Sequence, residues 1–527
     1  MSSSNPPSGL DPSSYSWAQV GHSVSPWRRK ALSFETTWLA RPKELHEIFV
    51  SGLLAFETPL PSCTLYSAVR QAWQALLFEV PELQARAVVA EDGNAYMQYR
   101  TPQDRHEVEE WAHRTAVFDY GDQSLDFKGL RENILIRKGD SSDPAFLLLY
   151  LEKESDGNKP LDHVHIILNT DHEITDGIGT RILFGKYLSL LSSCISEPQL
   201  GLVMYDWAES SKNLSPPWIS IMNQDQAISG SEFEETVAWN KEILLERMNA
   251  NPGLPLLLYP GPLKQETTFL TLSQKQTTSL LNAIKTTISP QSNITHLGHS
   301  AMVLALLRSS PSPSKGSFYS SCWLNGRRYL RATPSYVVPG KAYVPICMSF
   351  APIIFHDMDL KLRDDTTDEE LRNVLVRVCR VATEQYGRLS ARKSILGEFA
   401  VVAEEMGRKM LKPSHPPVRP KTSAPILLSD GLTDRYICHS YPSSPSPTST
   451  PVQQTVGKFT VDDVYFAANS DGEVVIRMSS FRGRMRISAE WRSDLFDGDM
   501  VRAFVDDVRR IMLVLVGDGK GLGGGGL

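Results

Sequence analysis

The short stretch His172-Glu-Ile-Thr-Asp176-Gly177 holds the residues of this chain that are best suited to chemistry. A neutral imidazole with an ordinary pKa near 6.5 can accept a proton from a hydroxyl or an amine at neutral pH. General-base help of this kind contributes roughly 10²–10⁴-fold to a rate. The alternative is structural, because Thr-Asp-Gly is also an ordinary turn and helix start.

The position of His172 in the sequence favours the catalytic interpretation. Residues 163–172 predict a buried strand, and residues 177–193 have the pattern of a helix. A side chain at the end of such a strand is held rigidly and points toward a crevice. Asp176 suits the N-terminus of the helix, and Gly177 permits a tight turn of the backbone. We therefore expect His172 to be a general base at the edge of a sheet.

The elements around this loop alternate between helices and strands, which indicates an α/β or α+β layer structure. A helix is expected over 61–86, capped by Ser62 or Thr64, and another over 367–389 with a capping box at Thr367 and Glu370. Hairpins are expected over 85–100, with a turn at 92–93, and over 473–491. Single strands are expected over 132–138, 145–153, 318–325 and 424–430, a strand pair over 341–356, a strand and helix over 269–287, and helices over 293–308 and 497–516.

The chain of 527 residues is too long for one simple domain, which indicates two or three domains, each with its own core. Residues 17–205 are expected to form an N-terminal lobe that carries the histidine, and residues 261–516 a C-terminal lobe. Residues 206–260, where the pattern weakens, would be the crossover between them. Residues 1–16 are expected to be a disordered tail and residues 517–527 a flexible, glycine-rich tail.

Composition excludes several classes of partner. The net charge of -6 and the absence of a basic run interleaved with aromatics argue against nucleic acid. No signal-peptide core and no stretch of about 18 apolar residues is found, so we expect a cytoplasmic protein with no membrane partner. Six cysteines lie far apart in the sequence, as is typical of reduced thiols in an intracellular protein.

No metal site is expected. The cysteines form no ligand pairs, and His296 and His299, three residues apart on one helix face, lack a third ligand. We expect these two histidines near the cleft at a helix start, or in solvent.

The loop of His172 resembles the HxxxDG motif of the chloramphenicol acetyltransferase-like superfamily, which includes condensation domains of nonribosomal peptide synthetases and plant and fungal acyltransferases. Other segments resemble the same enzymes in the same order along nearly the whole chain. They are LYSAVRQAWQALLFEVPELQAR, WLNGRRYL, VPICMSFAPIIF, PILLSDGLTDRYI and SSFRGRMRISAEW. The DFGWG element of the plant enzymes is absent. The overall similarity is closest to the fungal trichothecene 15-O-acetyltransferase-like group.

This resemblance implies two similar α/β lobes that form a V-shaped pseudo-dimer with a central tunnel. His172 would lie at the middle of the tunnel and deprotonate the acceptor. Asp176 would hold the loop by pairing with Arg327, with Arg328 as the competing partner. Asn325, Arg327, Ser429 and Ser480 would be substrate-binding residues. Ser429 would either contact an oxyanion or close a turn.

The implied function is acyl transfer, with acetyl-CoA or another acyl-CoA as co-substrate, a small-molecule alcohol of secondary metabolism as acceptor and no bound cofactor. A monomer is expected. No G-x-S-x-G elbow is present, which fits a direct transfer without a covalent enzyme intermediate. Two alternatives stay open. One is a condensation-like or cyclase enzyme that does not use acyl-CoA, and the other is a non-catalytic binding protein that kept the cleft.

Overall fold

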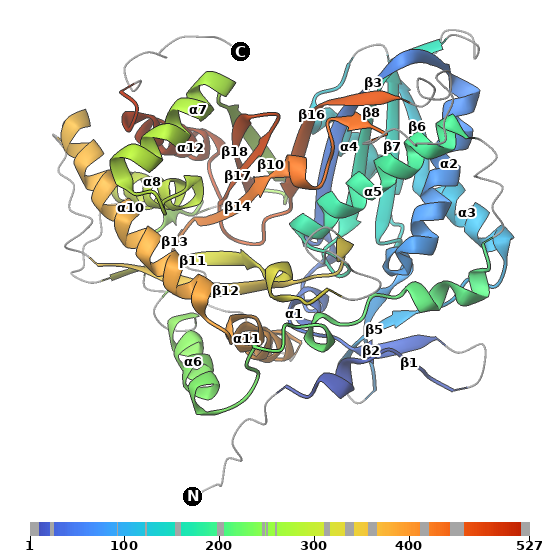
Figure 1. Ribbon diagram of the computed structural model, residues 1–527, viewed down its shortest axis with the longest axis horizontal. Helices are drawn as coiled ribbons and strands as arrows, with labels where there is room; N and C mark the ends of the chain where they lie inside the picture. Colours follow the sequence, from blue (N-terminus) through green and yellow to red (C-terminus); the bar gives the residue numbers. More distant parts are fainter. Residues whose placement is uncertain are drawn as a thin grey trace, which may run out of the picture.

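The computed structural model describes residues 10–21, 26–91, 93–121, 124–152, 160–197, 205–244, 248, 251–258, 261–309, 317–332, 342–356, 366–411, 421–442 and 458–517. The first nine residues of the expected N-terminal tail, the last ten of the C-terminal tail and Asp92 of the expected hairpin turn lie outside this range. The chain forms two lobes side by side, each built on a mixed sheet (Figure 1).

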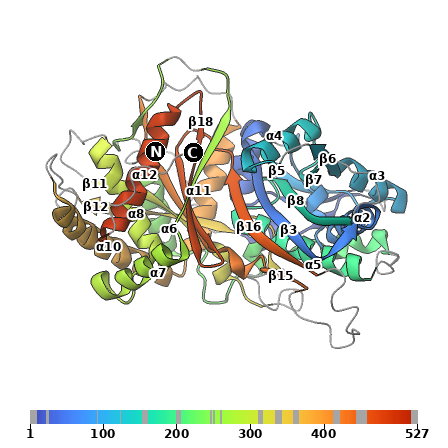
Figure 2. The same ribbon diagram turned by 90° about the horizontal axis from the view of Figure 1, so that it is seen from above.

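A six-stranded sheet forms the centre of the first lobe. Its strands, in spatial order, are β15 (Ser440–Tyr441), β16 (Phe459–Ala468), β3 (Glu47–Pro61), β8 (Pro160–Asp171), β7 (Ala145–Glu152) and β6 (Ala116–Gly121). β6 and β7 are parallel, and the other neighbours are antiparallel. β16 comes from the C-terminal half of the sequence yet pairs with β3 (Figure 2). The sequence pattern gave no indication of this exchange between the lobes.

Helices cover both faces of this sheet. α2 (Ser62–Glu79), α3 (Arg105–Thr115) and α5 (Gly177–Ser196) share one apolar core with it, and α4 (Phe127–Lys138) packs on the other face. Because both faces are covered, every residue of β7 except Glu152 is buried. This explains the continuous apolar run of the strand, since a strand with two covered faces has no reason to alternate.

The second lobe has its own six-stranded sheet, whose largest core is separate from that of the first. Its strands, in spatial order, are β10 (Gln265–Thr271), β18 (Arg484–Arg492), β17 (Val475–Phe481), β14 (Ile426–Leu432), β11 (Ser317–Asn325) and β12 (Met348–His356). The helices of this lobe are α6 (Ser231–Glu242), α7 (Gln274–Ala283), α8 (Ile294–Ser309), α10 (Asp368–Ala391), α11 (Ile395–Met410) and α12 (Gly498–Val514).

Smaller elements complete the fold. A four-stranded sheet contains β1 (Ala18–Gln19), β2 (Trp27–Lys30), β5 (Ala95–Tyr99) and β4 (Arg86–Val89), and β9 (Leu254–Pro255) pairs with β13 (Thr422–Ser423). The short helix α1 (Phe34–Leu39) precedes the first strand of the N-terminal lobe but packs on α11 of the second lobe (Figure 1).

Most of the expected elements are confirmed, including the β4–β5 and β17–β18 hairpins and the capping box of Thr367 and Glu370 on α10. The strand expected over 132–138 is wrong, because these residues belong to helix α4. Asp126 caps that helix, and Phe127, Leu130 and Ile134 are buried along one side of it. The expected cap of α2 is also wrong. The helix begins at Ser62 itself, and Pro61 occupies the N-cap position without a side-chain hydrogen bond.

The strand pair expected over 341–356 is a single strand, β12, which begins only at Met348. The described residues before it form no strand, and the backbone groups of residues 343–345 and 347 bond to the side chains of Arg327 and Asp176. Among the described residues, no helix combines the length and the apolar character needed to cross a membrane.

Candidate active site

His172 directly follows β8, where the sheet fixes its backbone. Asp171 is the register partner of Glu47, the first residue of β3, and the His172 N–H donates to the His46 carbonyl oxygen at 2.7 Å. His172 as a residue is half-buried, and its Nδ1 lies 3.0 Å from the carbonyl oxygen of Thr175. Because a carbonyl oxygen can only accept, Nδ1 carries the proton and Nε2 presents a lone pair. Nε2 makes no hydrogen bond with the described part of the chain.

The surroundings of His172 keep it neutral. Burial lowers the pKa of its imidazole to about 4 from the ordinary 6.5, although the carboxylates of Asp176 and Asp171 oppose the change. The expected ordinary pKa is therefore wrong. At pH 7 the ring is unprotonated at Nε2 and can accept a proton, and its lower pKa makes it a weaker base than free imidazole.

Two aromatic side chains that sequence reasoning missed lie beside this imidazole. The indole of Trp38 is stacked on it, with ring centroids 4.2 Å apart and an angle of 9° between the planes. His46 meets the same indole edge-on, at 5.7 Å and 72°. Both residues lie more than a hundred positions from His172 in the sequence, and no local pattern connects them with it.

His46 is the centre of a buried ion-paired cluster. Its Nδ1 lies 3.2 Å from Asp171 Oδ1 and 3.4 Å from Glu173 Oε1, and its Nε2 donates to the Arg41 carbonyl oxygen at 3.0 Å. Burial alone would lower the pKa of His46, but the two carboxylates raise it to about 9. The three side chains are close enough to hold a metal ion. We interpret them as an imidazolium between two carboxylates, because at a pKa of about 9 both ring nitrogens of His46 carry protons at neutral pH and neither can ligate a metal ion.

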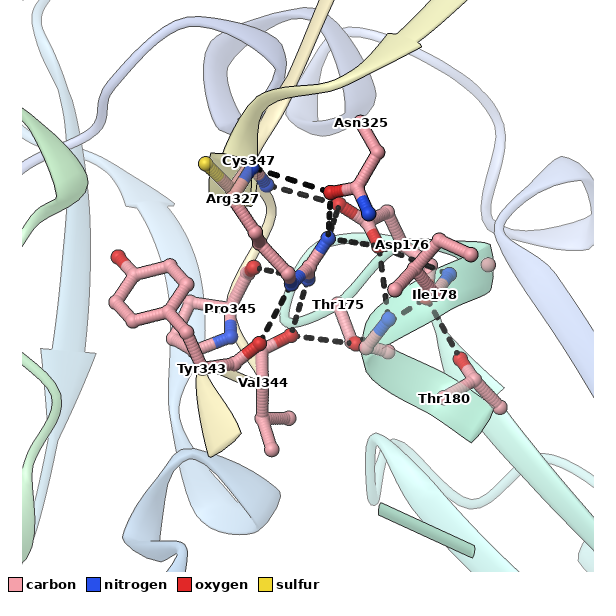
Figure 3. Close-up of polar contacts among 12 residues, drawn as sticks. Thr175, Asp176, Ile178, Thr180, Asn325, Arg327, Tyr343, Val344, Pro345 and Cys347 are labelled. Carbon is pink, nitrogen blue, oxygen red and sulfur yellow. Dashed lines mark hydrogen bonds and ion pairs between the residues drawn. The ribbon is translucent and has the colours of Figure 1, made fainter. Parts of the chain in front are cut away.

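Asp176 performs two structural tasks with one buried carboxylate (Figure 3). Oδ1 accepts from the backbone N–H groups of Ile178 at 3.0 Å and Gly179 at 2.9 Å, which caps α5. Oδ2 accepts from Arg327 Nη1 at 3.0 Å and from the Cys347 N–H at 2.8 Å. The expected cap and the pairing with Arg327 are both confirmed. The rival, Arg328, is exposed and lies over the ring of its neighbour Tyr329.

Arg327 is saturated by protein acceptors. A guanidinium has five N–H donors. The acceptors are Asp176, the Asn325 side chain and the backbone carbonyl oxygens of Tyr343, Val344 and Pro345 (Figure 3). Burial alone would lower the pKa of Arg327, but Asp176 holds it above its ordinary value. The guanidinium therefore ties β11 and the segment before β12 to the histidine loop and has no donor left for a substrate.

The glycine of the motif lies in close packing. Gly177 is the first residue of α5, and its backbone is not in the left-handed region. A Cβ at this position would lie 3.2 Å from Cζ of Phe466, on the strand β16 that crosses from the C-terminal half. Gly179, which sequence reasoning missed, is even closer to its surroundings, since a Cβ there would collide with the Val344 carbonyl oxygen. Gly179 therefore lets α5 start directly against the segment before β12 of the second lobe, whereas Gly177 leaves room for Phe466.

The other expected substrate-binding residues lie in the second lobe. Asn325 ends β11 and accepts the Arg327 N–H at 3.1 Å. Ser429 lies on β14 beside a bulge, and its Oγ is 2.7 Å from Thr295 Oγ1. Ser480 lies on the adjacent strand β17, partly exposed. Of the expected site residues, the structure thus joins Asp176, Asn325 and Arg327 by direct contacts. Ser429 and Ser480 contact none of them.

His296 and His299 are both buried in the second lobe on α8, which begins at Ile294, so of the two expected positions the one in solvent is wrong and His296 lies at the helix start. His296 Nδ1 lies 3.0 Å from Thr383 Oγ1. His299 lies between the hydroxyls of Tyr386, at 2.9 Å, and Ser320, at 2.5 Å. The helix that carries them packs on α10 and β14, so hydroxyl groups of neighbouring elements satisfy both rings.

A second buried ionic contact joins the lobes beside α5. Arg181 on α5 pairs with Asp430 on β14 at 2.6 Å, and Asp430 also pairs with Arg477 on β17 at 3.2 Å. Both guanidinium groups lie over the ring of Phe466, at 3.8 and 4.6 Å from its centroid. The helix that follows the histidine loop is therefore anchored to the second lobe at two places.

A cavity of about 880 Å³ lies between the lobes, with walls from β3, α4, β10 and β16. Its charged lining contains six carboxylates and three basic side chains, namely Glu44, Glu47, Asp126, Glu132, Glu266 and Asp463 against Lys128, Arg131 and Lys264. The cavity lining includes Glu47 of β3, whose register partner on the adjacent strand β8 is Asp171. His172 is not part of its lining, so the expected tunnel with this residue at its middle stays a prediction.

Two mixed α/β lobes that an aspartate–arginine pair joins at the histidine loop agree with the two-lobed fold of the chloramphenicol acetyltransferase-like class. Solved structures agree with this fold. The first condensation domain of the calcium-dependent antibiotic synthetase superimposes with a TM-score of 0.55 at 14% identity, covering 92% of this chain and 96% of that one. The chain belongs to the 15-O-acetyltransferase Tri3 family, whose profile matches residues 52–397.

Relatives of full length support the same assignment. The trichothecene 15-O-acetyltransferase TRI3 of Fusarium sporotrichioides is 21% identical over 530 residues, covering 97% of this chain and 98% of the relative. The trichothecene O-acetyltransferase TRI3 of Trichoderma arundinaceum is 24% identical over 477 residues, covering 87% of each. The solved structure of the Fusarium protein has a TM-score of 0.83 at 20% identity, with 96% and 99% coverage. The expected resemblance, the two-lobed fold and the acyltransferase activity, acetyl transfer to a hydroxyl group, are confirmed.

Proposed function

We propose that this enzyme transfers the acetyl group of acetyl-CoA to a hydroxyl group of a secondary metabolite, with His172 as the general base. The observation that carries the proposal is the tautomer of His172. Its Nδ1–H is engaged by the Thr175 carbonyl oxygen, which leaves the Nε2 lone pair of this half-buried residue without a partner among the described residues. A proton acceptor in this state can remove the proton of a hydroxyl group.

The reaction follows from that lone pair. Nε2 accepts the hydroxyl proton while the oxygen attacks the thioester carbonyl carbon, and a tetrahedral oxyanion forms. Collapse of this intermediate re-forms the carbonyl and breaks the C–S bond, and the departing thiolate takes the proton back from Nε2. The Thr175 carbonyl oxygen accepts from Nδ1–H throughout and so stabilises the transient imidazolium. Every proton that leaves the alcohol therefore ends on the thiol.

Asp176, Gly177 and Arg327 support this base without contacting the reacting atoms. The carboxylate of Asp176 is engaged with α5, Arg327 and Cys347, so it shapes the loop. Asn325 and Ser480 remain our proposed substrate contacts, because Asn325 Nδ2 and Ser480 Oγ make no hydrogen bond with the described residues. Ser429 is proposed as a weaker candidate, since its hydroxyl already pairs with Thr295.

We propose that the acceptor approaches through the interlobe cavity, whose lining reaches Glu47, the strand partner of Asp171, although His172 itself does not line it. Carboxylates outnumber basic groups in its lining, which disfavours the phosphates of acetyl-CoA and suits an uncharged alcohol. The volume of about 880 Å³ is within the usual range for a small-molecule site. Because two relatives are named for the acetylation of trichothecenes, we propose an acceptor of that chemical class.

The test measures thiol release from acetyl-CoA with a panel of hydroxylated metabolites, and identifies acetylated products by mass spectrometry. His172→Ala is expected to lower kcat by at least 100-fold with little change in thermal melting, in line with the usual contribution of a general base. His106→Ala removes an exposed histidine of α3 and serves as the matched control, with activity unchanged. Activity of His172→Ala within tenfold of the parent would refute the general-base role. Product formation without thiol release would instead identify an enzyme that does not use acyl-CoA.

A further inference from the structure

Trp38 is the side chain that covers the face of the proposed base. Its indole is nearly parallel to the His172 imidazole, at a centroid distance of 4.2 Å. The guanidinium of Arg41 also lies over this indole, 4.7 Å from its centroid, and His46 meets its edge. Arg41 and His46 thus define the orientation of the Trp38 indole, and the indole defines the plane of the His172 imidazole.

The indole is anchored to the second lobe, although His172 belongs to the first. Trp38 lies on α1 and shares an apolar cluster with Phe350 of β12 and Phe399 of α11. Thr37 Oγ1 donates to the Ala403 carbonyl oxygen of α11 at 3.1 Å. α11 has Gly407 where α1 approaches, and a Cβ there would lie 2.8 Å from the Thr36 backbone. The helix therefore cannot shift without disturbing the second lobe.

We propose that Trp38 is a positioning residue for His172, and that its indole holds the imidazole in the plane and tautomer needed for proton transfer. This proposal rests on the proposed function of His172. The hydrogen bond from Nδ1 to Thr175 fixes one point of the ring but leaves rotation about that axis open. A stacked indole closes this freedom, because tilting the imidazole out of the plane would drive it into the six-membered and five-membered rings of Trp38.

A purely structural role for Trp38 is the competing explanation, and one observation argues against it. The indole Nε1–H is buried and has no hydrogen-bond partner among the described residues. An unsatisfied buried donor destabilises a fold by about 1–3 kcal/mol, which a phenylalanine or leucine at this position would avoid. The size and planarity of the indole at this site therefore serve the ring stacked on it.

The experiment compares Trp38→Leu with Phe34→Leu, a matched change on the same helix. Phe34 packs in the same cluster, against Trp323 at 5.3 Å and Phe399 at 4.8 Å, but does not touch His172. Since misplacement of a catalytic group by about 1 Å can cost 10²-fold, we expect Trp38→Leu to lower kcat by roughly 10–100-fold while KM stays within about threefold. Phe34→Leu should keep kcat within about threefold of the parent value. Trp38→Phe keeps an aromatic ring stacked on His172, so its kcat should be closer to that of the parent than to that of Trp38→Leu.

Nuclear magnetic resonance of ¹⁵N-histidine-labelled protein gives a second readout that needs no substrate. The His172 signals are assigned by their absence in His172→Gln. We expect a single Nδ1–H tautomer in the parent protein and in Phe34→Leu, and a mixture of tautomers in Trp38→Leu. If Trp38→Leu does not fold, Trp38→Met is measured in the same way, because methionine fills irregular gaps.

The outcomes separate this inference from the proposed function. Trp38 is only a packing residue if Trp38→Leu keeps kcat within threefold, if Phe34→Leu lowers kcat as strongly, or if the tautomer is unchanged. The general-base proposal fails by a different result, activity in His172→Ala, and the tautomer measurement would still decide whether Trp38 orients the ring.

Discussion

The replacement Asp176→Asn tests the central physical argument, that one buried carboxylate holds the histidine loop across two lobes. The change keeps the shape of the side chain and removes its charge. Oδ1 can still cap α5, because asparagine and aspartate are about equally good at that position. The amide nitrogen of the asparagine, however, would take the place of Oδ2, which accepts from both Arg327 and the Cys347 N–H. A nitrogen that can only donate would then face two other donors.

The expected loss of stability comes from Arg327. Its side chain is 1% exposed, and Asp176 is its only carboxylate partner within the described residues. Removal of one partner of a buried ion pair typically destabilises a protein by about 3–5 kcal/mol. Because 1 kcal/mol shifts the melting temperature of a domain of about 150–250 residues by roughly 2–4 °C, we expect a fall of roughly 10 °C. The kcat for acetyl transfer should fall at least tenfold, because the loop that carries His172 loses its anchor.

Two controls separate the ion pair from the helix cap. Asp497→Asn makes the same change at the N-cap of α12, where the carboxylate accepts only the Met500 N–H, and should leave the melting temperature within about 2 °C. Arg327→Met combined with Asp176→Asn removes the stranded charge, so the double variant should melt above Asp176→Asn alone. If Asp176→Asn melts within 2 °C of the parent by calorimetry, the ion pair does not hold the loop and the argument is wrong.

Three further measurements test the site. Because burial lowers the pKa of His172 to about 4, kcat/KM should stay flat between pH 8 and pH 6 and fall only well below pH 6; an acid limb near pH 6.5 would contradict this. His46 has a folded pKa of about 9, above its ordinary 6.5, so its contribution to stability is complete below pH 6.5 and is lost as the pH rises through 9. Urea unfolding should therefore show a loss of roughly 3 kcal/mol over that window, which His46→Gln removes. Thr268→Trp on β10 intrudes into the cavity and should raise KM for the alcohol at least tenfold without changing that for acetyl-CoA, whereas Thr271→Trp, on the same strand outside the cavity, should change neither.

The sequence predicted those parts of the site that depend on local chemistry. His172, Asp176 and Gly177 lie on one loop because a strand, a turn and a helix N-terminus follow one another in the chain. Each of these three elements can be predicted from the residue pattern of its own segment. The partner Arg327 came from the resemblance of WLNGRRYL to a known strand end, and the structure confirms it. The short apolar stretch 132–138 was misjudged because its helical period becomes visible only when Phe127 and Leu130 are included.

Contacts that depend on tertiary structure could not be predicted in this way. Nothing near residue 38 or 46 in the sequence refers to position 172, and the pairing arises only because β3 and β8 are neighbours and α1 packs on α11. The pKa of His172 was misjudged for the same reason, since burial by distant segments lowers it. The crossing of β16 into the first lobe was also invisible, because its alternation of buried and exposed residues is the same whichever sheet receives it.

The contacts of the histidine loop also explain why two lobes are needed for one base. The backbone of His172 is fixed by β3 and β8 of the first lobe, whereas its stabilising contacts come from Arg327 on the second lobe and from Trp38 on a helix that packs there. Arg181 and Asp430 add a further link at the start of α5. If the lobes separated, the loop would lose the ion pair and the stacked ring together, so the geometry of the base depends on closure of the interface. We therefore expect mutations that loosen the interface far from His172, such as Asp430→Asn, to lower kcat more than they raise KM, and equal effects on both would argue that the lobes act only as substrate walls.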